Sequence, residues 1–232
     1  MRVLVVQNFD NTGLGQVGTA LIEAGAATDL RKPYLGDPLP SDAARHDAVI
    51  VLGGEQNALA DDDYPYFPDL LALLRDFAER DRAVLGICLG AQLVARAFGG
   101  ENRIGGAMEF GWCGVALAPE AKTDLVLGKV PERFPIFQWH DDTFSLPPGA
   151  VRLAGNDATA NQAFRIGRAV YGFQFHFEAD SEMVRDWSTT FAPTIAARHP
   201  DWPQRLEAEM ARKGPGADAA GLAIARAWVD MV

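Results

Sequence analysis

Short apolar runs alternate with helical stretches through the first hundred residues. Four short runs that favour β-structure predict strands at Val3 to Gln7, Thr28 to Arg31, Ala48 to Leu52 and Ala83 to Ile87. Apolar residues at helical spacing predict helices at Gly15 to Ala24, Phe67 to Arg80 and Ala91 to Phe98. This alternation is typical of a parallel sheet flanked by helices.

The rhythm changes in the second half of the chain. From Glu101 to Glu178, short strands separated by Gly and Pro predict antiparallel pairing. Helical patterning returns at about Ser181, with breaks expected near Pro200, near Pro203 and at Lys213 to Gly216. We therefore predict a single α/β domain over residues 1–232, with a mostly parallel central sheet flanked by helices, an antiparallel extension and a helical C-terminal tail.

Composition and charge limit the kinds of partner and cellular location that are expected for this protein. The chain has 232 residues, of which 48% are hydrophobic and 22% charged, as in globular proteins. Its formal charge of −10 repels phosphate backbones and anionic membranes, so neither nucleic acid nor membrane is an expected partner. The apolar run in Met1 to Asn8 is too short for a signal peptide, and no later run approaches membrane-spanning length. A soluble cytoplasmic protein is expected.

The two cysteines, Cys88 and Cys113, are too few for a disulfide scaffold, although a single disulfide between them is an alternative. The sequence contains no Cys-x-x-Cys pair, His-Glu-x-x-His run or acidic calcium loop. No metal or other cofactor is therefore expected.

Cys88 lies between a predicted strand and a predicted helix, in the Gly-x-Cys-x-Gly pattern formed with Gly86 and Gly90. This pattern is typical of a nucleophile elbow, where a sharp turn leaves no room for side chains and exposes the nucleophile. The N-terminus of the following helix favours a thiolate. An isolated cysteine in an apolar run is ordinarily packing material, and the two glycines favour a nucleophile instead.

A cysteine nucleophile needs a base, and His176 and Glu178 occupy one apparent strand two residues apart. Side chains at that spacing share a face, roughly 6 to 7 Å apart, so the carboxylate can orient the imidazole. Without the elbow, a core histidine satisfied by a neighbouring acid would be the preferred interpretation.

Donors for an oxyanion are offered by Gly53 and Gly54, which follow a predicted strand. The N–H of Gly54, with that of Leu89, can stabilise a tetrahedral intermediate. A Gly-Gly pair alone is weak evidence, because any tight turn can use it.

Three motifs together, Gly53-Gly54, Gly86 to Gln92 and Phe175 to Glu178, resemble the class I glutamine amidotransferase family in order and spacing. The resemblance covers nearly all of the chain to about Glu178. It implies a flavodoxin-like fold whose motifs meet at the carboxyl edge of the sheet. It also implies that glutamine is hydrolysed through a γ-glutamyl thioester with release of ammonia.

The resemblance assigns roles to individual residues. It implies Cys88 as nucleophile, His176 as general base and acid, Glu178 as its orienting partner, Gly54 and Leu89 as oxyanion donors, and Gln92, Gly53 and Glu109 as substrate-binding residues. The segments Met108 to Trp112 and Trp139 to Phe144 resemble stand-alone members similar to the amidotransferase part of GMP synthase, and are interpreted as fold and pocket markers.

Two positions depart from the family pattern. Glu55 follows the double glycine and Phe177 lies between His176 and Glu178, where Pro is common. Glu55 is expected to alter the oxyanion loop or the pocket rim, and Phe177 leaves a backbone N–H available for sheet pairing. Neither change removes a reacting group.

The sequence does not identify the molecule that accepts the ammonia. No Gly-x-x-x-x-Gly-Lys-Ser/Thr loop occurs in the sequence. Either a separate synthetase subunit uses ammonia from glutamine, or the enzyme acts alone on another γ-glutamyl small molecule, as γ-glutamyl peptidases do. A non-catalytic binding, regulatory or redox-sensing module on the same fold is a third alternative, which the complete Cys, His and Glu set disfavours.

Overall fold

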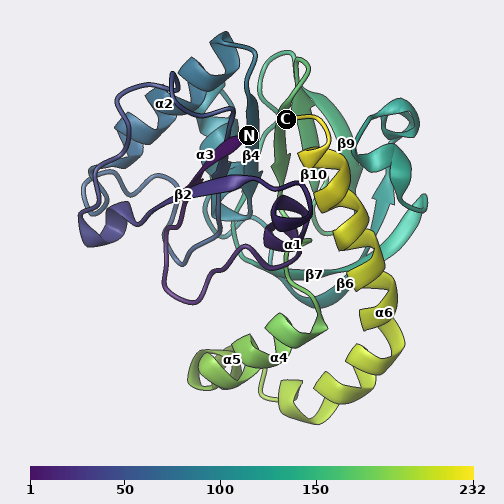
Figure 1. Ribbon diagram of the computed structural model, residues 1–232. Coiled ribbons are helices and arrows are strands. Elements are labelled where there is room, and N and C mark those ends of the chain that lie inside the picture. The colour runs from purple at the N-terminus through teal and green to yellow at the C-terminus, as the bar shows by residue number, and fades with distance from the viewer.

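The structure, a computed structural model, describes residues 1–232 and has one large sheet covered by helices on both faces (Figure 1). The nine strands of this sheet follow the order β2-β1-β3-β4-β11-β10-β9-β6-β7. Five are parallel: β2 (Ala27–Arg31), β1 (Arg2–Val6), β3 (Ala48–Val51), β4 (Ala83–Ile87) and β11 (Val170–Phe173). Four extend it in antiparallel fashion: β10 (Ala163–Ile166), β9 (Val151–Gly155), β6 (Glu109–Leu117) and β7 (Arg133–His140). The predicted fold class is confirmed.

The remaining elements are helices and one short ribbon. The α-helices are α1 (Gly15–Glu23), α2 (Phe67–Glu79), α3 (Leu89–Ala97), α4 (Ser181–Thr190), α5 (Ala192–Arg198) and α6 (Trp202–Val229). Short 3-10 helices occupy Pro33–Leu35, Pro119–Thr123 and Leu127–Lys129, and β5 (Asn102–Arg103) pairs with β8 (Thr143–Phe144). None of the helices combines the length and hydrophobicity needed to cross a membrane.

The core has two halves because successive residues of a strand point to opposite faces of the sheet. In β1, Val3 and Val5 join one apolar cluster with side chains of α1 and α6. Leu4 and Val6 join the other, with side chains of α2 and α3. The continuous apolar runs in the sequence therefore reflect strands that are buried on both sides.

The predicted helical break at Lys213 to Gly216 is wrong, since α6 runs without interruption from Trp202 to Val229 with Pro215 inside it. An internal proline removes one backbone hydrogen bond and ordinarily breaks a helix. Packing outweighs that cost here, because buried small residues such as Ala217 and Gly221 bring α6 close to the rest of the protein. A Cβ atom at Gly221 would overlap the carbonyl oxygen of Phe177. The expected break near Pro200 does occur, between α5 and α6.

The carboxyl ends of the parallel strands face the end of the molecule at which α4 and α5 lie (Figure 1). In the same view both chain termini lie at the opposite end. Loops after the carboxyl ends of parallel strands are the usual place for ligand sites in open α/β sheets.

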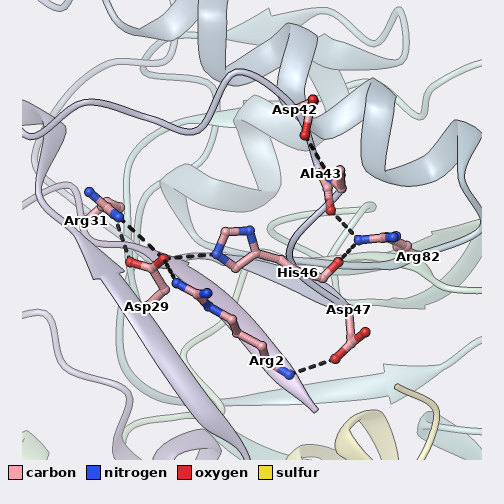
Figure 2. A network of polar contacts seen from close by, with 9 residues as sticks. Arg2, Asp29, Arg31, Asp42, Ala43, His46, Asp47 and Arg82 are labelled. Carbon is pink, nitrogen blue, oxygen red and sulfur yellow. Dashed lines mark hydrogen bonds and ion pairs between the residues drawn. The ribbon is translucent and has the colours of Figure 1, made fainter.

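A polar network fixes the outer strand β2 to its neighbours (Figure 2). The Asp29 carboxylate accepts hydrogen bonds from Arg31 Nε at 2.8 Å and Arg2 Nη2 at 2.7 Å, and His46 Nε2 lies 3.0 Å away. Arg82 donates to two carbonyl oxygens in the loop before β3, one of them that of His46. The hydrogen bond from Arg31, together with those from His46 and Arg2, holds the pKa of Asp29 well below its usual range despite partial desolvation.

The substitution Asp29→Asn is expected to lower the free energy of unfolding by about 1 to 3 kcal/mol at pH 7, because it removes the charge that these donors share. The pKa of Asp29 is lower in the folded than in the unfolded chain, so its contribution is complete above the unfolded pKa and is lost as pH falls. The difference between wild type and variant should therefore narrow below about pH 4. Urea denaturation at a series of pH values measures this difference. Asp63→Asn, at an exposed position outside any ion pair, is the control; a pH-independent difference would contradict the assignment.

Candidate active site

Cys88 occupies a strained turn between β4 and α3. Its φ of 53° and ψ of −110° lie outside the regions that side-chain-bearing residues prefer. Both neighbouring glycines are required, because a Cβ atom at Gly86 would overlap the carbonyl oxygen of Gly90, and one at Gly90 would overlap that of Val51. The turn has the geometry expected of a nucleophile elbow. Cys88 and Cys113 are both free thiols, so the disulfide alternative is excluded.

His176 and Glu178 lie beyond the end of β11, so the prediction that they share one continuous strand is wrong. The strand ends at Phe173 because the chain changes partners: the N–H of His176 donates to Phe137 O of β7 at 2.9 Å and forms an isolated bridge. The expected contact between the two side chains is nevertheless present, with His176 Nδ1 2.7 Å from Glu178 Oε1. The carboxylate can therefore fix the ring orientation.

The start of α1 holds the backbone of this segment. The N–H of Gln16 donates to Glu178 O at 2.8 Å, and its side-chain Nε2 donates to Phe177 O at 3.0 Å. Gly15, with φ of 46°, is needed because a Cβ atom there would overlap the Glu178 carbonyl oxygen. The N–H of Phe177 enters no backbone hydrogen bond in the sheet. Its fully buried ring instead packs on that of Phe173, with centroids 4.8 Å apart.

The electrostatics of the site favour a charged imidazole. Burial opposes a charge on His176, but the negative charges of Glu178 and Cys88, with hydrogen bonds to both, raise the pKa of His176 well above its usual value. An imidazolium beside a sulfur atom stabilises a thiolate. Both side chains lie beside Gly53 and line the same pocket, so that they can act as a pair.

A pocket of about 300 Å³ opens above these residues. Five of the predicted site residues line it together: Cys88, His176, Gly54, Leu89 and Gln92. Gln92 is nearly buried, and its Nε2 donates to Gln174 Oε1 at 3.3 Å. Glu55, which departs from the family pattern, is exposed and lines the pocket, so that an effect on the pocket rim stays a prediction.

The two glycines after β3, Gly53 and Gly54, contact different residues of the site. Gly53 lies beside Cys88 and His176, because a Cβ atom there would be 3.2 Å from His176 Cε1 and 3.5 Å from Cys88 Cβ. Gly54 lies against Leu89, and its N–H donates to no protein acceptor. The N–H of Leu89 begins α3, where first-turn donors lack helical partners. Both N–H groups are thus available to a ligand.

Glu109 does not line the pocket. Its Oε1 accepts from Asn156 Nδ2 and its Oε2 from Gln162 Nε2, both at 2.6 Å, and His140 Nε2 lies 3.3 Å from Oε2. Burial raises its pKa, but contacts with His140, Thr159 and Asn156 outweigh this and lower the pKa overall. Since His140 does line the pocket, the expected part of Glu109 in substrate binding would be indirect.

Sequence reasoning missed one wall of the pocket. Phe9, Trp139, Trp187 and Phe191 contribute aromatic side chains, and Thr194 and Arg198 complete the lining on that side. The sequence marks the segment of Trp139 only as a feature of the fold and pocket. The i, i+4 spacing of Trp187 and Phe191 in the tail was the available signal, but periodicity alone does not separate a pocket wall from a core stripe.

Comparison with known proteins agrees with this geometry. Residues 18–186 match the family described as glutamine amidotransferase class-I. Among curated relatives, the glutamine amidotransferase-like protein YfeJ of Salmonella typhimurium is 28% identical over 165 residues, covering 70% of this chain and 69% of that protein. A subunit of the glutamine-hydrolysing GMP synthase of Haloarcula marismortui is 31% identical, covering 76% and 85%. Gamma-glutamyl peptidase 5 of Arabidopsis thaliana is 28% identical, covering 70% and 66%.

Solved structures show the same similarity over nearly the whole chain. A glutamine amidotransferase from Thermotoga maritima superposes with a TM-score of 0.87 at 25% identity, covering 99% of this chain and 96% of that one. One from Methylobacillus flagellatus gives 0.86 at 30% identity, covering 100% and 95%. The chain therefore belongs to the class I glutamine amidotransferase family.

Proposed function

We propose that Cys88, His176 and Glu178 form a catalytic triad that hydrolyses the γ-amide of glutamine or of a related γ-glutamyl compound. The observation that carries this proposal is the strained Cys88 turn at the pocket floor, beside a buried His176 that is paired with Glu178. A positioned nucleophile, base and orienting acid are the set that covalent acyl transfer requires.

The chemistry follows from these positions. The Cys88 thiolate attacks the γ-carbonyl carbon, and the oxyanion that forms accepts hydrogen bonds from the N–H groups of Gly54 and Leu89. As the carbon–nitrogen bond breaks, the leaving nitrogen takes the proton of His176, and a γ-glutamyl thioester remains on Cys88. Water then attacks the thioester while His176 accepts its proton, which releases glutamate and restores the thiolate.

Glutamine is our first candidate substrate, because Gln92 lines the pocket at the position that the family resemblance associates with the substrate's α-amino and carboxylate groups. The ammonia would then serve a separate acceptor or a synthetase subunit. The similarity to a γ-glutamyl peptidase supports a second candidate, in which the enzyme acts alone on other γ-glutamyl compounds. Both candidates use the same triad.

Cys88→Ser or Cys88→Ala is expected to lower kcat for hydrolysis at least about a thousandfold, because the group that becomes acylated is lost. Glutamate and ammonia released from glutamine and from γ-glutamyl dipeptides are both measured. Cys113→Ser is the matched control and should retain wild-type rates. More than a few per cent of wild-type activity in the Cys88 variants would refute the assignment, provided that their thermal unfolding is unchanged.

Alkylation should distinguish the two cysteines without any substrate. Burial raises the pKa of Cys113 to about 11, so that at pH 7 only about one such thiol in ten thousand is ionised. Iodoacetamide at pH 7 is expected to modify Cys88 at least about tenfold faster than Cys113, because the thiolate is the nucleophile. A time course of peptide mass spectrometry measures both rates. His176→Gln should slow modification at Cys88, and preferential labelling of Cys113 would contradict the pairing.

Glu178→Gln is expected to lower kcat about a hundredfold or more, because the amide no longer provides the charge that orients and stabilises the imidazolium. The charge of Glu178 raises the pKa of His176, so its removal should lower that pKa and slow Cys88 alkylation near neutral pH. Steady-state rates and alkylation are both followed. Glu182→Gln, at an exposed position four residues further on, serves as the control; equal rates for the two variants would exclude Glu178 from the triad.

A further inference from the structure

One wall of the pocket is aromatic. Phe191 packs on Phe9 and Trp139, with ring centroids 6.1 and 5.4 Å apart, and Trp139 packs on Trp187 at 6.2 Å. Phe9, Trp139 and Phe191 are only partly buried, so they leave ring surface beside the pocket. An ammonia molecule leaving from glutamine is small and polar, and it gains nothing from such a surface.

The wall lies on the side from which a leaving group departs. The leaving nitrogen must take a proton from His176, so its substituent lies next to that ring. The Trp187 ring packs edge-on against His176, with centroids 5.2 Å apart. The carbonyl oxygen of Trp139 is 3.8 Å from Cys88 Sγ. A substituent on the leaving nitrogen would therefore contact these aromatic side chains.

The charges around the pocket select against an anionic leaving group. Three carboxylates line it, those of Glu55, Asp141 and Asp142. Arg198 is the one lysine or arginine in the lining, and its Nη2 donates to Asp141 Oδ1 at 2.8 Å. The carboxylate of an amino-acid leaving group would meet two unpaired acids and an arginine that is already neutralised. An uncharged group is the better match.

Most of the wall lies outside the part of the chain that matches the family, and Trp139 is the one wall residue inside it. Trp187 belongs to α4, Thr194 and Arg198 belong to α5, and Phe191 connects the two helices. All four lie beyond residues 18–186. The matched part contains the proposed reacting groups, whereas the helices after it contribute most of the wall. The groups proposed for the chemistry and most of those proposed for specificity thus come from different segments of the chain.

We propose that the preferred substrates are γ-glutamyl amides whose nitrogen carries an uncharged substituent with an aromatic ring, and that this ring packs against Trp139 and Phe191. This proposal rests on the proposed triad. The bond broken joins the γ-carbonyl carbon to the amine nitrogen, the amine leaves with the proton from His176, and water releases glutamate from the thioester.

The test compares four substrates on the full-length chain: γ-glutamylbenzylamide, γ-glutamylmethylamide, γ-glutamylphenylalanine and glutamine. Ring contacts in a desolvated pocket should make kcat/KM for the benzylamide about 10-fold to 100-fold higher than for the methylamide. It should exceed that for γ-glutamylphenylalanine by about tenfold or more, because the latter carries a carboxylate beside its ring, on a linker one carbon longer. Glutamate release is measured throughout.

Two variants separate packing from aromatic contact. Phe191→Ala should bring the benzylamide to methylamide ratio close to one, mainly through a higher KM for the benzylamide, whereas Phe191→Leu should keep most of the preference. Cys88→Ala, tested on every substrate, reports on the triad itself.

The outcomes distinguish the two proposals. Cys88-dependent hydrolysis with a wild-type ratio near one would overturn the aromatic subsite alone. Equal rates for γ-glutamylphenylalanine and the benzylamide would overturn its preference for uncharged groups. Hydrolysis that persists in Cys88→Ala would remove the triad, and no hydrolysis of any of the four substrates would overturn both proposals.

Discussion

The site depends on the backbone turn at Cys88, which is held in a conformation that an isolated chain would avoid. Such strain persists only where the surroundings determine the backbone fully. Here β4 is paired on one side with β3 and on the other with β11, and the N–H of Cys88 continues the pairing by donating to Phe173 O at 2.8 Å. The same strands place the segments after β3 and β11 beside the turn. One constraint on the sheet thereby fixes the sulfur atom, the proposed oxyanion donors and the imidazole together.

The carboxylate of Glu178 needs a different support, because it lies beyond the last sheet residue. Two helices from opposite ends of the sequence supply it. Gln16 at the start of α1 holds the carbonyl groups of Phe177 and Glu178, and Gly221 in α6 lets that helix approach the same segment. Substitutions at Gly15 or Gly221 would therefore act on the orientation of His176 without touching the pocket.

Most of the fold could be read from the sequence because β1, β3 and β4 are buried on both faces and leave unbroken apolar runs between clear helices. The turn at Cys88 was recognisable since it leaves room only for glycine at Gly86 and Gly90. What local patterns did not reveal were tertiary effects. Packing carries α6 through Pro215, a change of hydrogen-bonding partner takes His176 out of its strand, and folding encloses Glu109 among Asn156, Gln162 and His140. Each of these three features depends on contacts between residues that are distant in sequence, so a short stretch of the sequence cannot predict it.

The hydrogen bonds that join Ser181 of α4 to Asp218 of α6 bear on how this protein family can diversify. The N–H and Oγ of Ser181 both donate to the Asp218 carboxylate, at 3.0 and 2.7 Å, only three residues after Glu178. The segment between Ser181 and Asp218 includes α5, and these hydrogen bonds hold its two ends together. Changes in the exposed part of α5 can reshape the mouth of the pocket, whereas Trp187 packs on His176 and Trp202 lies in the core, so that α4 and α6 are constrained. Substrate preference in the family can therefore change through the solvent-facing positions of α5, while the buried positions of α4 and α6 keep the fold around Cys88 and His176.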